Sequence, residues 1–220
     1  MTFYDHPYKK YAFVLFSLPM IWIVSSLLSG RYFPDPAEPV MTLTGIWAVV
    51  FLVFTLLMTP LVKVSRFKWI SRFRRFIGLT VFWYSSAHVC GYLVLHAGFS
   101  WVWIKEDLLK RPYMYVGFIA VVILSVLALT SFKFAIKKLR KNWKPLHRTV
   151  YIAVLLVILH LWWQVKSDIS VALYSSLALV PFLMYRLNAS YFPTLHTRIK
   201  ETITKIKKTE KSACVKKSGR

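Results

Sequence analysis

Long apolar runs alternate with short polar stretches along most of the chain. Each of six runs approaches or exceeds the roughly 18 residues with which a helix crosses a bilayer. The pattern therefore predicts an all-α integral membrane protein, a six-transmembrane-helix bundle. Glycine and proline separate the first two runs, and Arg111-Pro112 begins the fourth. The runs cover residues 11–29, 42–62, 76–97, 113–132, 146–165 and 170–187.

The basic residues alternate from side to side of this predicted bundle. All but five of the 30 lysines and arginines lie in residues 1–10, 61–76 and 133–148 or from Arg186 onward. By the positive-inside rule, both termini are predicted to be cytoplasmic. The expected organisation is a cytoplasmic N-terminus (1–10), a transmembrane domain (11–187) and a basic cytoplasmic tail (188–220). The five exceptions are Arg31, Lys105, Lys110, Arg111 and Lys166.

Composition agrees with a bilayer as the surrounding medium. The 220 residues are 57% hydrophobic and 17% aromatic, which is too apolar for a soluble domain. The net charge of +22 would fit nucleic acid, but its one-sided distribution is a topology signal, and no nucleic-acid partner is expected. Cys90 and Cys214 are poorly placed to pair, and no C-x-x-C-H occurs, so any haem would be held without covalent attachment. No cleavable signal peptide is evident.

The stretch from Pro145 to Lys166 carries the first chemical signal. It is expected to form one spanning helix with His147 and His160, because polar residues in a spanning helix are costly and usually functional. Thirteen residues at 1.5 Å each put the two histidines roughly 19 to 20 Å apart along the axis. In a hydrocarbon core about 30 Å thick, one would lie near each face. Imidazoles at two depths suggest haem iron at two depths and electron transfer across the membrane.

His88 on the third predicted helix is the expected partner of His160. The third and fifth helices run in the same direction, and both histidines lie at a similar distance from the inner end. Facing imidazoles at one depth are what bis-histidine ligation of haem b requires. The alternative is two hydrogen-bonded polar residues that pack the bundle.

His147 and the neighbouring arginines have weaker signals. His147 lies at the cytoplasmic mouth, where an interfacial histidine needs no explanation, and a second haem there would lack a nameable axial partner, because Arg74 occupies the matching position of the third helix. Arg74, Arg75 and Arg148 are candidate contacts for haem propionates, or simply topology-setting charges. His96 lies near the outer interface and is expected to have no ligand role.

Two surface segments each have two interpretations. Apolar residues recur at helical spacing among the lysines of 195–206, as in a helix lying on an anionic membrane, or the tail is simply a solvated basic segment. The outer loop from Phe99 to Arg111 alternates aromatic and charged residues, as in a docking surface or an interfacial aromatic belt.

Two absences bear on the function class. No predicted span contains Asp or Glu, which weakens an ion-coupled transporter. No G-x-G-x-x-G and no following soluble domain is evident, so electrons are expected from a partner or a membrane-soluble carrier.

Several short motifs, in their order and spacing, resemble the MsrQ (YedZ) family, the haem-binding membrane subunits of the MsrPQ system, within the ferric-reductase-like and NADPH-oxidase-like membrane cytochromes. The resemblance covers about residues 42 to 187. The matching stretches are Thr59-Pro60-Leu61, Arg74 to Leu79, Ser86-Ala87-His88 with Tyr92, Arg111-Pro112-Tyr113 with Gly117, Ala128 to Ser131, and Leu139 to Lys166 including Trp143, Leu146-His147 and His160.

The resemblance implies haem b ligated by His88 and His160, with His147 also implicated and one or two haems in total. It implies flavin mononucleotide (FMN), although no FMN-binding motif can be identified here. It also implies location in a bacterial inner membrane and electrons drawn from the quinone pool or a cytosolic flavin reductase. The acceptor would be MsrP, a periplasmic molybdopterin reductase that repairs methionine sulfoxide. Catalysis would then occur in the partner, and this chain would hold no catalytic residue of its own.

Two rival functions remain at this point. A related membrane cytochrome would reduce ferric iron or oxygen directly, without MsrP. A small-molecule transporter uses six helices as readily, although the lack of buried carboxylates counts against it.

Overall fold

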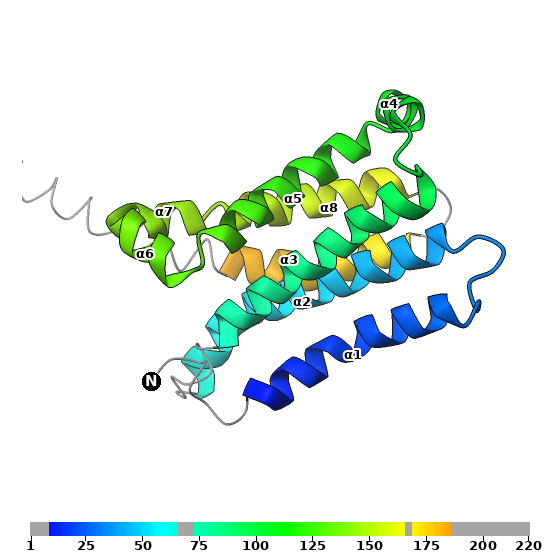
Figure 1. The fold of residues 1–220 in the computed structure, drawn as a ribbon. Coiled ribbons are helices and arrows are strands. Elements are labelled where there is room, and N and C mark those ends of the chain that lie inside the picture. Colours follow the sequence, from blue (N-terminus) through cyan, green and yellow to red (C-terminus); the bar gives the residue numbers. More distant parts are fainter. Residues whose placement is uncertain (1–8, 66–72, 166–168, 186–220) are drawn as a thin grey trace, which may run out of the picture. The chain divides into compact units, whose positions relative to one another are not determined.

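The computed structural model describes residues 9–65, 73–165 and 169–185. Every regular element within these ranges is helical, so the all-α prediction is confirmed for them (Figure 1). The predicted surface helix at 195–206 lies outside the described residues. The elements are α1 (Lys9–Leu28), α2 (Ala37–Ser65), α3 (Phe73–Gly91), the π-helical turn η3 (Tyr92–His96), α4 (Trp101–Lys110), α5 (Tyr113–Leu129), α6 (Lys133–Leu139), the 3-10 turn η4 (Arg140–Asn142), α7 (Trp143–His147), α8 (Val150–Gln164) and a last helix at Ser170–Tyr185.

The helices associate in pairs. The chain divides by its contacts into Met1–Val180 and Pro181–Arg220, and the packing described here is that of the first unit. Within it, α2 packs along α3 and α5 packs along α8. A contact between α3 and α5 joins the two pairs, and α1 packs on α2 (Figure 1). The two pairs are therefore linked through the helix that carries His88.

Among the described residues, three helices are long and apolar enough to cross a membrane: Lys10–Leu28, Ala37–Val62 and Phe73–His96. Two bent helix pairs raise the number to as many as five if each pair is one span. The apolar helix Ser170–Tyr185 is shorter. A multi-pass membrane protein is thus confirmed, whereas six spans and cytoplasmic termini stay predictions.

The expected single helix from Pro145 to Lys166 is wrong. α7 ends at His147, α8 begins at Val150, and the helical segment Lys133–His147, of which α7 is the last part, makes an angle of 43° with α8. The main chain tightens at the break, because Arg148 and Thr149 donate to carbonyls only three residues back. The Thr149 hydroxyl also donates to the Leu146 carbonyl at 2.7 Å, which competes with the regular helical bond to that oxygen. His147 and His160 therefore do not share one straight axis.

The segment from Phe99 to Arg111, expected to be a loop, is mostly the helix α4. Gly98 and Phe99 both have positive φ (55° and 57°) and turn the chain sharply after η3. The axis of α4 then makes an angle of 108° with α5. Such a helix lies across the end of the bundle rather than along it (Figure 1).

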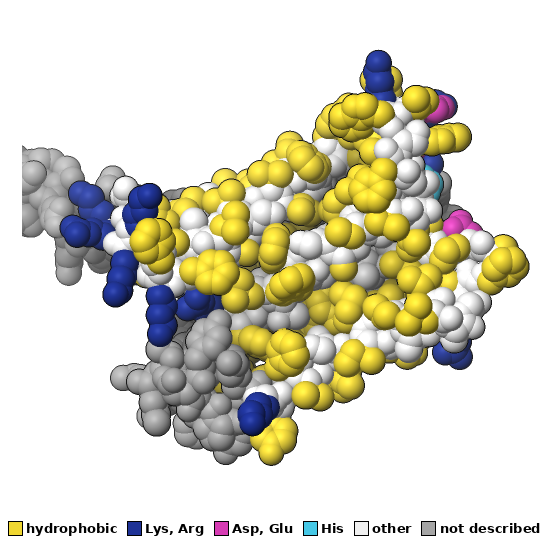
Figure 2. Space-filling model, viewed as in Figure 1, with side chains coloured by type: hydrophobic (Ala, Val, Ile, Leu, Met, Phe, Trp, Pro, Cys, Tyr) yellow, Lys and Arg dark blue, Asp and Glu magenta, His cyan; other side chains and the backbone are white. Residues whose placement is uncertain are grey.

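Charges separate along the bundle in the same sense as the sequence predicts. In the space-filling view, Lys and Arg gather over α6 and α7, while Asp and Glu appear only toward the α4 end (Figure 2). Hydrophobic side chains cover the surface between these ends (Figure 2). This distribution fits an apolar belt in lipid, with the α6–α7 end on the positively charged side.

Polar side chains inside the bundle are satisfied locally. Lipid tails are as apolar as the helices, so helix association depends on packing and hydrogen bonds rather than on the hydrophobic effect. The hydroxyls of Thr44, Thr55 and Thr80 donate to carbonyls four residues back, at 2.6, 2.9 and 3.1 Å. The α2–α3 interface can therefore contain these threonines without leaving polar atoms unpaired.

Tyr84 repairs the turn of α1 that contains Pro19. Its hydroxyl accepts a hydrogen bond from the Met20 N–H and donates one to the Phe16 carbonyl, both at 3.0 Å. In an uninterrupted helix these two main-chain groups bond to each other. Proline weakens a helix at this point, and a side chain inserted into the ladder restores its bonds. The buried Tyr84 ring also packs on Phe51 of α2, with ring centroids 4.9 Å apart.

We expect Tyr84→Phe to destabilise the protein by about 1 to 3 kcal/mol, because two main-chain groups of α1 lose their partner in a non-aqueous setting. The thermal midpoint in detergent, followed by tryptophan fluorescence, measures the change. Tyr115→Phe is the control, since it removes a hydroxyl from an exposed tyrosine on α5. Equal midpoints for the two variants would contradict the bridging role.

Candidate functional site

His88 is held against α2 by one main-chain hydrogen bond. Its Nδ1 lies 2.8 Å from the carbonyl oxygen of Met41, and since a carbonyl only accepts, the ring nitrogen is the donor. Gly45 follows one helical turn later on α2. A Cβ at that position would lie 3.2 Å from His88 Nδ1, so glycine lets the imidazole approach the helix backbone.

His160 repeats this arrangement on the other helix pair. Its Nδ1 lies 2.9 Å from the carbonyl oxygen of Tyr113 at the start of α5. Gly117 follows one turn later, and a Cβ there would come within 2.7 Å of His160 Nδ1 and 2.8 Å of Cε1. No ordinary Cβ contact is so short, so the imidazole occupies space that only glycine leaves open.

The two histidines form a matched pair. Each follows its carbonyl partner by 47 residues and donates from Nδ1, so Nε2 is the unprotonated nitrogen of both rings. Both side chains are half-buried, and they are near enough to interact electrostatically with each other. The sequence pattern predicts these two residues as ligands. It does not predict the carbonyl that bonds to each ring or the role of the glycine that makes room for it. A glycine at the same distance before each histidine was the available signal.

This donor set fits a haem. Two neutral imidazoles from different helices, with Nδ1 hydrogen-bonded and Nε2 available, are the axial ligands of a bis-histidine haem. The hydrogen bond to a carbonyl fixes the tautomer and orients the ring, as in metal sites generally. The glycine surfaces at 45 and 117 supply the space that the rings need.

His147 lies in a different environment, at the α7 end. Its ring stacks on Trp143, with centroids 4.1 Å apart and 29° between planes. Its Nε2 lies 3.2 Å from the Thr130 hydroxyl. Because that hydroxyl donates to the Val126 carbonyl at 2.7 Å, Nε2 of His147 is the donor, and Nδ1 keeps the lone pair. His147 is therefore held in the opposite tautomer from His88 and His160.

The three arginines of the sequence prediction lie near this end. Arg74 is exposed in the first turn of α3 and interacts electrostatically with His147. Arg75 is partly buried beside it, and Arg148 is exposed at the break between α7 and α8. Of these three arginines, Arg74 is the one that interacts electrostatically with His147.

His96 belongs to a cluster that sequence analysis missed. Asp107 of α4 is buried (8% exposed) and accepts a hydrogen bond from the Tyr92 hydroxyl at 3.1 Å. The same carboxylate oxygen lies 3.2 Å from His96 Nε2, and the other lies 3.3 Å from Arg111 Nε. The sequence placed both acids of α4 in a loop, and nothing in its pattern distinguished Asp107 from its neighbour Glu106.

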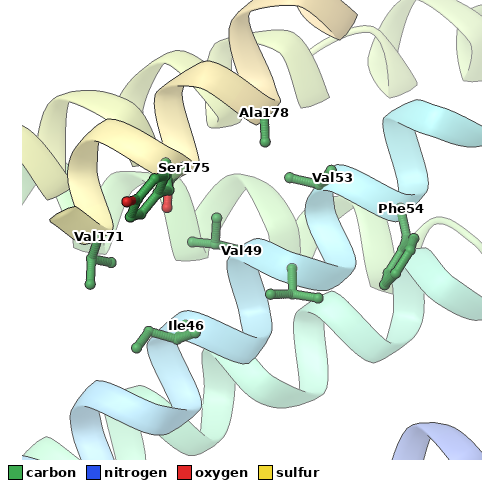
Figure 3. A pocket seen from close by; sticks show the side chains of 9 residues that line it. Ile46, Val49, Val53, Phe54, Val171, Ser175 and Ala178 are labelled. Atoms are coloured by element: carbon green, nitrogen blue, oxygen red, sulfur yellow. The ribbon is translucent and has the colours of Figure 1, made fainter.

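An apolar groove lies elsewhere in the bundle, between α2 and the helix Ser170–Tyr185 (Figure 3). Its volume is about 340 Å³. Its only side-chain hydroxyls come from Tyr174 and Ser175, so it offers no imidazole, thiol or carboxylate to a metal. The lining residues are Ile46, Val49, Val50, Val53, Phe54, Val171, Tyr174, Ser175 and Ala178.

Comparison with known proteins identifies the family of the chain. Residues 44–158 match the family of ferric reductase like transmembrane components. No solved structure matches.

Three bacterial proteins, each named protein-methionine-sulfoxide reductase heme-binding subunit MsrQ, are similar to the chain over most of its length. The protein of Xanthomonas euvesicatoria is 44% identical over 66% of this chain and 67% of its own. That of Xanthomonas oryzae is 42% identical over 72% and 73%, respectively. That of Polaromonas naphthalenivorans is 38% identical over 72% and 74%. The resemblance seen in the motifs is confirmed, and the chain belongs to the MsrQ family of ferric-reductase-like membrane proteins.

Proposed function

We propose that the protein is a haem b electron-transfer subunit of the inner membrane. It passes electrons from the quinone pool or a cytosolic flavin reductase to a periplasmic molybdopterin methionine sulfoxide reductase, MsrP, which repairs oxidised periplasmic proteins. His88 and His160 are the axial ligands in this proposal. The substrate chemistry belongs to the partner, so no catalytic residue is assigned to this chain.

The matched pair of imidazoles is the observation that supports this function most directly. Structural histidines need only a hydrogen bond, and one nitrogen of each ring already has one. The second nitrogen of each ring is left unprotonated by that bond, which a packing role does not require. The relatives' names, which specify heme binding, support the same assignment.

Each element of the site has a defined task. Haem, when bound, would supply a one-electron redox centre inside a medium that water-soluble electron carriers do not enter. His88 and His160 hold it from two helix pairs, so ligation also links α2–α3 to α5–α8. The carbonyls of Met41 and Tyr113 keep the Nδ1 protons in place and prevent rotation of the rings.

The α7 end is the proposed inner side. Here His147 is a candidate ligand of a second haem, and Arg74, Arg75 and Arg148 are candidate contacts for haem propionates, because guanidinium groups bind carboxylates well. FMN is proposed from membership of the family only, and no residue is assigned to it. The basic surface over α6 and α7 supports the inner orientation (Figure 2).

We expect His88→Ala and His160→Ala to lose the haem held by this pair and to abolish electron delivery, because each removes an axial ligand. The haem-to-protein ratio of detergent-purified protein, measured as the pyridine haemochrome, checks the loss. Wild-type protein without haem, despite adequate haem supply, would instead favour the transporter alternative.

Gly117→Ala should lower the haem content more than Gly45→Ala, since a Cβ would lie 2.7 Å from His160 Nδ1 in one case and 3.2 Å from His88 Nδ1 in the other. Gly78→Ala is the matched control, because its Cβ would meet no atom within 4 Å. The same haemochrome assay ranks the three variants. If Gly117→Ala kept the same haem content as Gly78→Ala, the claim that Gly117 makes room for the His160 ring would be contradicted.

His147→Ala should cause a smaller loss of haem than His88→Ala. A ratio of two haems in the wild type, falling to one in this variant, would identify His147 as a ligand. An unchanged ratio and spectrum would assign His147 to packing with Trp143 and Thr130.

The match to ferric-reductase-like proteins favours one second candidate function, direct reduction of ferric iron. Reduction of ferric chelates by the purified protein, with and without MsrP, separates the two functions. We expect turnover to depend on MsrP and its sulfoxide substrate; partner-independent ferric reduction would favour the alternative.

A further inference from the structure

Asp107 stands out among the charged residues of the described chain because it is a buried carboxylate in a helix that lies across the end of the bundle. Asp107 is 8% exposed as a whole residue. The side chain of Glu106, in contrast, is 43% exposed and pairs with Lys110 one turn away on the same helix. Burying a carboxylate is costly unless several donors surround it. Asp107 therefore needs partners, and these come from two segments, the turn η3 and the junction between α4 and α5.

The first segment is the end of the helix that carries His88. Tyr92 and His96 lie in the π-helical turn η3, which directly continues α3, and both contact the same Asp107 oxygen. Their rings are stacked, with centroids 5.5 Å apart. Tyr92 follows His88 by one turn. A π-turn shifts the register of side chains beyond it, and such turns recur at functional sites.

The second segment is the junction between α4 and α5, just before the Tyr113 carbonyl that holds His160. Arg111 lies one turn after Asp107 at the end of α4 and contacts it twice, through Nε at 3.3 Å and through the ordinary helical bond from its main-chain N–H to the Asp107 carbonyl at 2.8 Å. The next residue but one is Tyr113, whose carbonyl accepts the Nδ1 proton of His160. Tyr92 also lies near enough to Tyr113 to interact electrostatically with it. One carboxylate thus connects the helix of the first imidazole with the carbonyl that orients the second.

We propose that Asp107 is a positioning residue for the His88–His160 pair. By tying Tyr92 and His96 to Arg111, it sets how α3 stands relative to the first turn of α5, and through these elements the relative orientation of the two imidazole planes. The inference rests on the proposed function, since it concerns a haem held by the two histidines.

The test compares three variants of the full-length protein, purified with haem. Asp107→Asn removes the charge and weakens all three contacts. Tyr92→Phe removes only the hydroxyl that bonds to Asp107 and keeps every charge, so any change it causes reports geometry. Glu106→Gln is the matched control, an adjacent carboxylate on the same helix that pairs with Lys110.

The readouts are the haem-to-protein ratio, the electron paramagnetic resonance spectrum of the ferric low-spin haem and its midpoint potential. The spectrum depends on the angle between the two imidazole planes. We expect Asp107→Asn and Tyr92→Phe to keep the wild-type haem ratio while shifting the largest g value and the potential, and Glu106→Gln to change none of the three.

Each other result has a distinct meaning. Wild-type spectra and potentials in both Asp107→Asn and Tyr92→Phe would overturn the positioning role and leave the proposed function intact. Equal shifts in Glu106→Gln would overturn it as well, because charge alone would then explain the effect. If Asp107→Asn does not fold, Tyr92→Phe decides alone. A wild-type protein that binds no haem would instead refute the proposed function itself.

Discussion

The hydrogen bond from an imidazole Nδ1 to a main-chain carbonyl of a neighbouring helix is the interaction on which the proposed site depends. It occurs twice, from His88 to Met41 and from His160 to Tyr113. A helical carbonyl already accepts one bond from its own ladder, and its second lone pair is available only to a group that approaches the backbone closely. Gly45 and Gly117 permit that approach, and each bond then leaves Nε2 unprotonated. One contact thus fixes position, orientation and protonation together.

Several hydroxyls of the bundle answer a related constraint, that a polar group inside hydrocarbon is costly without a partner. Threonines of α2 and α3 bond to carbonyls of their own helices, and Tyr84 supplies the bonds that Pro19 disturbs in α1. These hydroxyls are used in hydrogen bonds to the main chain and do not form a binding site. The two histidines differ because only half of each ring is used. The second nitrogen of each imidazole is the part of the ring that the proposed haem would use.

The two ends of the bundle are organised differently. At the α7 end, basic residues surround His147, and the ring is committed to Trp143 and Thr130. At the α4 end, one buried carboxylate joins a tyrosine and a histidine of η3 to the arginine that ends its own helix. The first arrangement suits topology and anionic groups such as propionates, whereas the second fixes helices in relation to each other.

Patterns in the sequence are sufficient to predict an all-α membrane protein of the MsrQ family. They also predict His88 and His160 as the candidate haem ligands. Apolar run length and the paired imidazoles are local properties, which a chain carries whatever its tertiary contacts. The break after His147 was missed, because it depends on the Thr149 hydroxyl competing for the Leu146 carbonyl, a bond that apolar periodicity does not record. The helix α4 lies where a loop is expected, because its ten residues are too few to cross a membrane and the length of apolar runs does not mark them as a helix.

The groups that surround each imidazole depend on tertiary packing. The carbonyls of Met41 and Tyr113 are main-chain atoms present at every position, so the sequence cannot mark them, and they matter only because α2 meets α3 and α5 meets α8. Asp107 is a second example. It is adjacent to Glu106 in the sequence, and only the packing of its helix gives the two carboxylates different partners. Distances between segments far apart in the chain are set by packing, and the chemistry of this site depends on those distances.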